Sequence, residues 1–298
     1  MTDTTEVHQL QLADGRLIDL RVSGPADGIP LVFHHGTPSS GYQRGALQQA
    51  AHARGLRLVT TSRPGYGGSS PQPGRQVVDV VADTSAVLAH LGISQCLVAG
   101  WSGGGPHALA CGAQLSAAAA VLVIAGVGPY DADDLDFLAG MGEDNILEMT
   151  AALQGEDAVR PFMVARREEQ RTAVTPERIF EMLDTLLPDV DRAVLTPQWA
   201  QDLAASYADA QRVGIEGWLE DDVAFVRPWG FDLSEISVPT AIWQGSADLM
   251  VPFAHGQWLA AHVPGAIAHL EEGQGHLSIA VGALDRMLDE LIAVSGLR

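Results

Sequence analysis

Ser102 lies in the stretch AGWSGGGPHA, with Gly100 two residues before it and Gly104 two residues after it. A serine on a tight turn between a strand and a helix adopts strained backbone angles, and the neighbouring chain must pass close by. Small residues avoid the resulting clash, and the helix that follows directs its positive end toward the hydroxyl. The spacing therefore fits a nucleophile, although a glycine-rich turn can also carry an ordinary surface serine.

A serine hydroxyl is a poor nucleophile at neutral pH, so it needs a base within reach and an acid that orients the base. Of the ten histidines, His276 follows the last predicted strand, in the turn GQGHL, and Asp248 follows the strand before it, in GSADLMVP. Functional groups of parallel sheets gather at the C-terminal ends of the strands. We therefore expect a catalytic triad of Ser102, Asp248 and His276, in that chain order.

The acid of this triad has competitors. Asp131, Asp133 and Asp134 follow the segment GVGPY, after an earlier strand where some related enzymes carry the acid. Asp248 is favoured because it stands at a strand end and is followed by Val-Pro.

An anion hole is the third requirement of acyl transfer, and the loop HHGTPSSG after an early strand can supply it. Gly36 lets the chain turn, so that the backbone N–H of Thr37 joins that of Gly103 in facing a developing oxyanion. Loss of one such donor typically lowers turnover by about 10²–10³. We therefore expect Thr37 and Gly103 to be the oxyanion donors.

The elements that would position these residues alternate between strand and helix. The chain opens with a predicted hairpin, EVHQLQL and RLIDLRVS, and continues with the apolar runs PLVFHHG, LRLVTTS, CLVAG and AAVLVIAG separated by helical segments. Near-continuous apolar strands with intervening helices are typical of a parallel sheet covered on both faces. The fold class is therefore α/β.

The alternation stops near residue 128 and resumes near residue 231. The segment between them is helical in pattern, and two of its helices begin with N-cap and proline pairs at Thr175 and Thr196. We expect a core domain made of residues 1–128 and 231–298, interrupted by a helical insertion at 129–230.

The composition limits the kinds of molecule that the protein is expected to bind. The chain has 298 residues and a formal net charge of −20, so it lacks the field that attracts nucleic acid or anionic lipid. No signal peptide and no apolar run long enough to span a membrane is visible, which favours a cytoplasmic protein acting on a small molecule, as a monomer or homodimer. Cys96 and Cys111 are expected to be buried packing residues.

Five motifs resemble the α/β-hydrolase superfamily over essentially the whole chain: HHGTPSSG, SRPGYGGSS, AGWSGGG, GSADLMVP and GQGHL. The resemblance implies an eight-stranded, mostly parallel sheet with helices on both faces and a helical cap inserted after the sixth strand. It assigns Ser102 as nucleophile, His276 as base, Asp248 as orienting acid, and Thr37 and Gly103 as oxyanion donors. No cofactor is implied.

Differences between this sequence and the motifs of related enzymes limit the reactions that it can be expected to catalyse. Epoxide hydrolases and haloalkane dehalogenases carry an aspartate where this chain has Ser102, and proline iminopeptidases read HGGPG where it has HGTPS. A serine hydrolase that cleaves a small carboxylic ester through an acyl-enzyme is the leading interpretation. Amide, lactone or carbon–carbon bond hydrolysis, cofactor-free perhydrolysis, and a non-catalytic small-molecule receptor remain alternatives.

Several further residues have an expected place. Trp101, His34 and Tyr130 flank the nucleophile, the oxyanion loop and the start of the insertion, and we expect them to contact substrate. Adjacent histidines on a strand point to opposite faces, so His34 and His35 are not expected to bind a metal. Arg63 and Tyr66 are expected to hold their own loop in place.

Overall fold

The sheet and its covering helices are seen in a computed structural model, which describes residues 5–43, 45–172 and 175–297. The strands are β1 (Glu6–Gln11), β2 (Leu17–Ser23), β3 (Ile29–His34), β4 (Leu56–Thr61), β5 (Cys96–Trp101), β6 (Ala118–Ile124), β7 (Thr240–Gly245) and β8 (Ile267–Glu271). The helices of the core are α1 (Gly45–Ala53), α2 (Val80–Leu91), α3 (Gly104–Gln114), α10 (Phe253–His262) and α11 (Ser278–Ser295).

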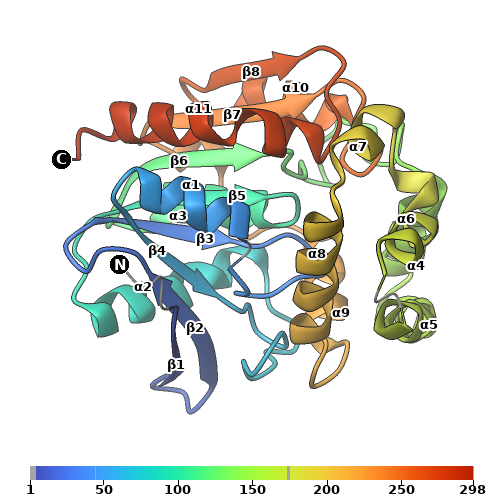
Figure 1. Cartoon of the computed structure of the whole chain (residues 1–298), viewed down its shortest axis with the longest axis horizontal. Helices are drawn as coiled ribbons and strands as arrows, with labels where there is room; N and C mark the ends of the chain where they lie inside the picture. Colours follow the sequence, from blue (N-terminus) through green and yellow to red (C-terminus); the bar gives the residue numbers. More distant parts are fainter. Residues whose placement is uncertain (1–4, 44, 173–174, 298) are drawn as a thin grey trace.

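One eight-stranded sheet has the strand order β1-β2-β4-β3-β5-β6-β7-β8. Strand β2 runs antiparallel to both of its neighbours, whereas every pair from β4 to β8 is parallel. Helices α1 and α11 cover one face of this sheet, and α2, α3 and α10 cover the other (Figure 1). The predicted fold class is thereby confirmed.

The central strands have apolar side chains on both faces of the sheet. In β5, Val98 packs into the cluster beneath α3, whereas Leu97 and Ala99 pack into the cluster beneath α11. All three are essentially inaccessible to solvent, which is why the sequence reads as a continuous apolar stretch instead of an alternating one. Cys96 and Cys111 are free, buried thiols of the α3 side, as expected.

The insertion between β6 and β7 is helical. Its helices are α4 (Glu143–Leu153), α5 (Glu156–Thr172), α6 (Pro176–Met182), α7 (Asp189–Val194), α8 (Pro197–Ala210) and α9 (Glu216–Phe225). They lie together beyond the ends to which β6 and β7 point (Figure 1). Thr175 and Thr196 accept hydrogen bonds from the N–H groups of Arg178 and Trp199, so both predicted N-caps are confirmed.

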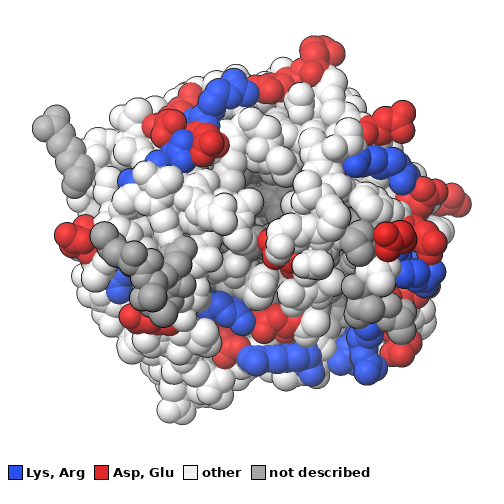
Figure 2. Space-filling view, in the orientation of Figure 1, with Lys and Arg blue, Asp and Glu red and all other residues white. Residues whose placement is uncertain are grey.

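All 17 basic residues of the chain are arginines. On the face shown in Figure 2 they lie among acidic side chains and form no separate basic patch. No helix among the described residues is long and apolar enough to cross a membrane.

His255, on α10, joins the core to the start of the insertion. Its Nδ1 accepts a hydrogen bond from the N–H of Gly128 at 3.0 Å, and its Nε2–H donates to the carbonyl of Phe137 at 2.9 Å. The neutral ring satisfies both partners, whereas a protonated ring would direct a second N–H at the N–H of Gly128. Burial lowers the pKa of His255 from 6.5 to about 4.

Acidification is therefore expected to destabilise this junction. The unfolded chain takes up the His255 proton first, so the stabilisation is complete above pH ~6.5 and is lost as the pH falls toward ~4, by about 2 kcal/mol at pH 5. The measurement is the free energy of unfolding in urea at pH 7 and at pH 5 for wild type and His255→Asn. The variant should lose about 2 kcal/mol less than wild type on acidification, because other titrating groups are shared by both proteins. Equal losses would contradict the assignment.

Candidate active site

Ser102 occupies the turn between β5 and α3 with a φ of 59°, a left-handed conformation that non-glycine residues rarely adopt. Its neighbours must be glycines for steric reasons. A Cβ on Gly100 would lie 2.1 Å from the carbonyl oxygen of Gly104, and a Cβ on Gly104 would lie 2.1 Å from that of His34. The turn thus raises the serine above the sheet at the N-terminus of a helix, as the spacing predicts.

His276 and Asp248 lie next to each other in loops after β8 and β7. The Nδ1–H of His276 donates to Oδ2 of Asp248 at 2.8 Å, and both side chains are almost completely buried. Asp248 also accepts from the backbone N–H groups of Met250 and Val251, each at 2.8 Å, and from Nε2 of Gln244 at 3.0 Å. Four donors hold the carboxylate, which in turn fixes the imidazole tautomer and leaves Nε2 as the acceptor.

Ser102 and His276 line one cavity of about 50 Å³, together with Gly36, Thr37 and Trp101. The ring of Trp101 packs against that of His276, with centroids 5.2 Å apart. No hydrogen bond joins the Ser102 hydroxyl to His276, and such catalytic contacts often tighten only in the complex with substrate. The three chain segments of the expected triad therefore meet at one place.

The expected oxyanion donors lie beside the nucleophile. Thr37 and Gly103 both line the cavity that contains Ser102, and a Cβ on Gly103 would lie 2.4 Å from Oγ1 of Thr37. Within the part of the chain that the structure describes, the backbone N–H groups of Thr37 and Gly103 have no acceptor in the protein. Two amides of this kind can bind a negative oxygen that develops next to Ser102.

Asp221, on α9 of the insertion, is the centre of a buried polar cluster beneath the oxyanion loop. Its Oδ2 accepts from Oγ1 of Thr37 at 2.6 Å, from Nη2 of Arg63 at 2.6 Å and from the hydroxyl of Tyr66 at 3.0 Å. Its Oδ1 accepts from Nη2 of Arg75 at 2.6 Å. The insertion thereby holds the side chain of the residue whose amide is the expected oxyanion donor.

Glu220, also on α9, pairs with Arg75 at 3.1 Å, so the cluster has two carboxylates and two arginines. The Asp221 carboxylate is fully buried, yet Arg63 and Arg75 hold its pKa well below the ordinary value, against the opposing effect of burial. Arg63 also donates to the carbonyls of His35 at 2.5 Å and Gly36 at 3.2 Å. The expected role of Arg63 and Tyr66 in fixing a loop therefore extends to the oxyanion loop as well as their own.

Asp191, on α7 of the insertion, holds the loop that carries His276. Its Oδ1 accepts from the N–H groups of Leu277 at 3.1 Å and Ser278 at 2.8 Å, at the start of α11. A Cβ on Gly275 would lie 2.4 Å from this oxygen, so any larger residue there would displace the Asp191 carboxylate. The insertion therefore contacts the loop beside the base as well as the oxyanion loop.

Two residues with an expected substrate contact lie elsewhere. His34 is only 1% exposed, and its Nε2 lies 3.5 Å from Sγ of Cys111, because the last residue of β3 turns its side chain under α3. Tyr130 packs against Phe137 on the protein surface, with ring centroids 5.4 Å apart. Neither lines a cavity that contains Ser102, whereas Trp101 does. The structure therefore places Trp101, but not His34 or Tyr130, beside Ser102.

The competing acids are also separated from the base. Asp131, Asp133 and Asp134 are exposed, and Asp134 accepts a hydrogen bond from the indole of Trp258 instead. His35 donates from Nδ1 to the carbonyl of Gly36 at 2.7 Å and accepts at Nε2 from Arg63. Among the described residues, no group of three His, Cys, Asp or Glu side chains could hold a metal ion.

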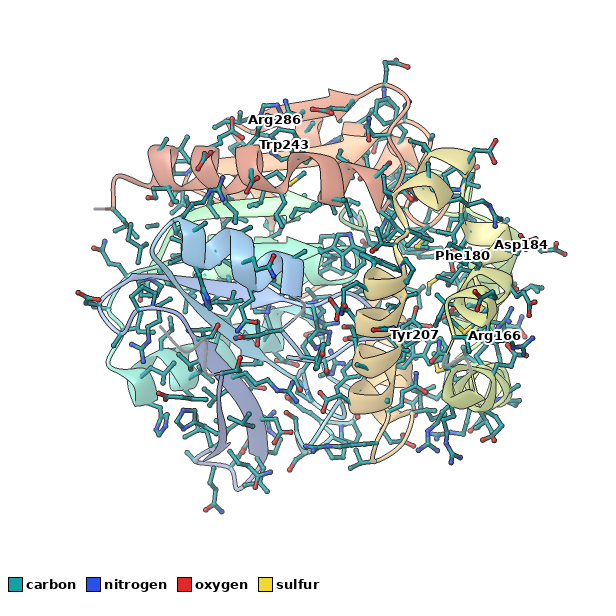
Figure 3. All side chains as sticks on the ribbon, viewed as in Figure 1. Arg166, Phe180, Asp184, Tyr207, Trp243 and Arg286 are labelled. Carbon is teal, nitrogen blue, oxygen red and sulfur yellow. The ribbon has the colours of Figure 1, made fainter. Side chains whose placement is uncertain are left out.

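A larger cavity of about 130 Å³ extends from Ser102 into the insertion. Large apolar side chains form most of its wall: Phe137, Met141, Met149, Phe162, Met182, Leu183, Leu186, Trp218, Phe225 and Met250. Arg166 on α5 and Tyr207 on α8, both labelled in Figure 3, also line it. Substrate would therefore lie between the sheet and the helical insertion.

The sequence offered only a weak signal for the two carboxylates contributed by the insertion. Asp221 lies in the segment WLEDDVAF, where acids stand among apolar residues, a pattern that also fits a solvent-facing turn of a helix. Asp191 lies in α7, a short helix that the sequence analysis did not identify. Both were missed because their partners are distant in sequence; 158 residues separate Arg63 from Asp221.

Comparison with known proteins places this geometry among related folds. A family model described as the alpha/beta hydrolase fold matches residues 29–283. A non-heme haloperoxidase of Rhodococcus erythropolis is 27% identical over 231 residues, which are 76% of this chain and 78% of that protein.

Solved structures agree with this match at the level of the fold. An esterase from Exiguobacterium antarcticum superposes with a TM-score of 0.70 at 20% identity, covering 98% of this chain and 100% of the other. Epoxide hydrolase A from Mycobacterium thermoresistibile gives a TM-score of 0.70 at 21% identity, covering 99% of both chains. The fold is thus shared by proteins whose named activities differ.

Proposed function

The chain belongs to the alpha/beta hydrolase fold family, and we propose that within it the protein is a serine hydrolase that cleaves a small carboxylic ester or a related acyl substrate. One observation carries this proposal. Ser102, in a left-handed turn, and His276, whose Nδ1–H is bonded to Asp248, line the same cavity. This is the arrangement that activates a hydroxyl toward a carbonyl carbon.

In the proposed reaction, Oγ of Ser102 attacks the carbonyl carbon while Nε2 of His276 accepts the hydroxyl proton. The carbonyl oxygen becomes an oxyanion that the amides of Thr37 and Gly103 bind, and Asp248 stabilises the imidazolium. Collapse of the tetrahedral intermediate expels the alcohol, which takes the proton from His276. Water activated by the same histidine then hydrolyses the acyl-enzyme and releases the acid.

Perhydrolysis is a second candidate, because a relative over most of the chain is named a non-heme haloperoxidase. Hydrogen peroxide would then replace water in attacking the acyl-enzyme, and a peracid would leave in place of the acid. The same Ser102 and His276 perform both reactions. Formation of peracid from an ester and hydrogen peroxide distinguishes this outcome from simple hydrolysis.

A fluorophosphonate probe tests whether Ser102 is nucleophilic. We expect stoichiometric labelling of the folded protein, because the probe's phosphorus captures an activated serine hydroxyl. Intact-protein mass spectrometry measures the labelled fraction, and peptide mapping locates the label; Ser102→Ala, which lacks the hydroxyl, is the control. Failure of the folded wild-type protein to react would favour a non-catalytic receptor.

A panel of short acyl esters, lactones and amides identifies the bond that is cleaved. We expect the highest kcat/KM on esters, because an alkoxide or phenolate leaves with little acid assistance, whereas an amine requires more.

A further inference from the structure

The larger cavity has a polar end that the proposed reaction does not use. Glu148 on α4 and Asp222 on α9 line it together with Ser102 and many apolar side chains. Both acids belong to the insertion, whereas the expected triad belongs to the core. A substrate bound at Ser102 would therefore extend toward two carboxyl groups.

Glu148 is the more exposed member of this pair. Its side chain is only partly buried, and its Oε1 accepts a hydrogen bond from the indole N–H of Trp218 at 2.5 Å. Asp222 is fully buried. Among the described residues, no N–H or hydroxyl group donates to either oxygen of Asp222. A buried carboxylate without a donor is costly, which favours the protonated form of Asp222.

The two carboxyl groups interact, and they cannot both be ionised at close range. Burial and the neighbouring Glu148 raise the pKa of Asp222 well above its ordinary value. Burial raises the pKa of Glu148 as well, so the two carboxyl groups hold a proton between them. Arg166 lines the same cavity but is bound by two other acids, Asp144 and Glu169. One carboxylate of the cavity is thus left with acceptor capacity.

We propose that Glu148, backed by Asp222, recognises a hydrogen-bond-donating group on the substrate, a hydroxyl or an ammonium, at the end remote from the scissile carbonyl. This inference rests on the proposed function, because the reacting carbonyl must lie at Ser102. The cavity, of about 130 Å³, limits the intervening chain to few atoms. A cavity of roughly 150 Å³ holds a benzene molecule. Small substrates with a polar end therefore fit.

Matched esters test this recognition. The probes are ethyl esters of straight-chain acids that end in methyl, hydroxyl or ammonium, compared at equal numbers of heavy atoms over a series of chain lengths. At one length, we expect wild type to prefer a hydroxyl or ammonium end over methyl by at least about tenfold in kcat/KM. In Glu148→Gln the preference should fall to within about twofold. A comparable preference for methyl at every length would overturn the proposal.

Two further variants test whether the preference depends on Glu148 itself. Glu143→Gln removes one exposed acid from the same helix, so its preference should equal that of wild type. Glu148→Asp shortens the side chain by one methylene, so the best substrate should become one methylene longer. The length optimum depends on where the carboxylate lies and not on its charge. It can therefore be measured even if Glu148→Gln does not fold. An unchanged length optimum would contradict a direct contact.

Binding without turnover separates this inference from the proposed function. Isothermal titration of Ser102→Ala with the same esters should show at least about tenfold tighter binding of the hydroxyl or ammonium ester than of its methyl counterpart. That result supports recognition by Glu148 even if no ester is hydrolysed. Equal affinities, with hydrolysis intact in wild type, would refute the recognition site and leave the serine hydrolase standing.

Discussion

Replacing Ser102 with alanine is expected to lower kcat on an aryl ester by at least about 10³-fold. The change removes the nucleophile but leaves His276, Asp248 and both expected oxyanion amides in place, so a small residual rate over the uncatalysed reaction should persist. Stopped-flow and steady-state kinetics on a p-nitrophenyl ester measure the effect. Wild type should also show a burst of p-nitrophenol if deacylation is slower than acylation, and the variant should show none.

The fold of this variant should remain intact, because alanine removes only a hydroxyl that makes no hydrogen bond to His276 in the structure. The substitution is not expected to relieve the backbone strain at position 102, because alanine also has a Cβ. The thermal midpoint and the circular dichroism spectrum therefore serve as controls. Retention of most of the activity in a correctly folded variant would show that Ser102 is not the nucleophile.

The second large effect is expected for Asp221→Asn. The variant keeps the shape of the side chain but leaves Arg63 buried without a carboxylate and Arg75 with Glu220 alone, and breaking a buried ion pair typically costs about 3–5 kcal/mol. The thermal midpoint should fall by roughly 10 °C. Turnover should fall as well, because the amide side chain cannot accept from Thr37, Tyr66 and both arginines at once. Thermal unfolding and kcat/KM together measure the two consequences.

Glu216→Gln is the matched control for Asp221→Asn. Glu216 lies on the same helix, α9, but pairs with Arg160 at the protein surface, with about 45% of its side chain exposed. Such exposed pairs contribute about 0–1 kcal/mol, so stability and activity should change little. If Asp221→Asn behaved like this control, the buried cluster would not be holding the oxyanion loop.

Much of the core could be predicted from the sequence because its determinants are local. Gly100 and Gly104 are required by the backbone around Ser102, within two residues of it. Asp248 and His276 could be placed because parallel strands bring their C-terminal ends together whatever the intervening sequence. The sequence alone was therefore sufficient to predict that Ser102, Asp248 and His276 belong to one site.

The contributions of the insertion could not be predicted in the same way. Whether an acid on an amphipathic helix faces water or a buried arginine depends on how the helix docks, and Asp191, Asp221 and Asp222 are all buried. His34 illustrates the same limit within the sheet. Alternation predicts that His34 and His35 point to opposite faces, but it does not say whether either of them reaches the Ser102 cavity, and neither does.

Asp221 and its two arginines also bear on how the molecule unfolds. Arg63 and Arg75 belong to the loop after β4 in the core, whereas Asp221 belongs to α9 of the insertion. Neither part could bury its own charges alone, because an unpaired ion costs several kcal/mol to desolvate. The two parts are therefore thermodynamically interdependent. Heat should melt them as one cooperative unit, with a single calorimetric peak, and a separately expressed helical segment should not hold its shape.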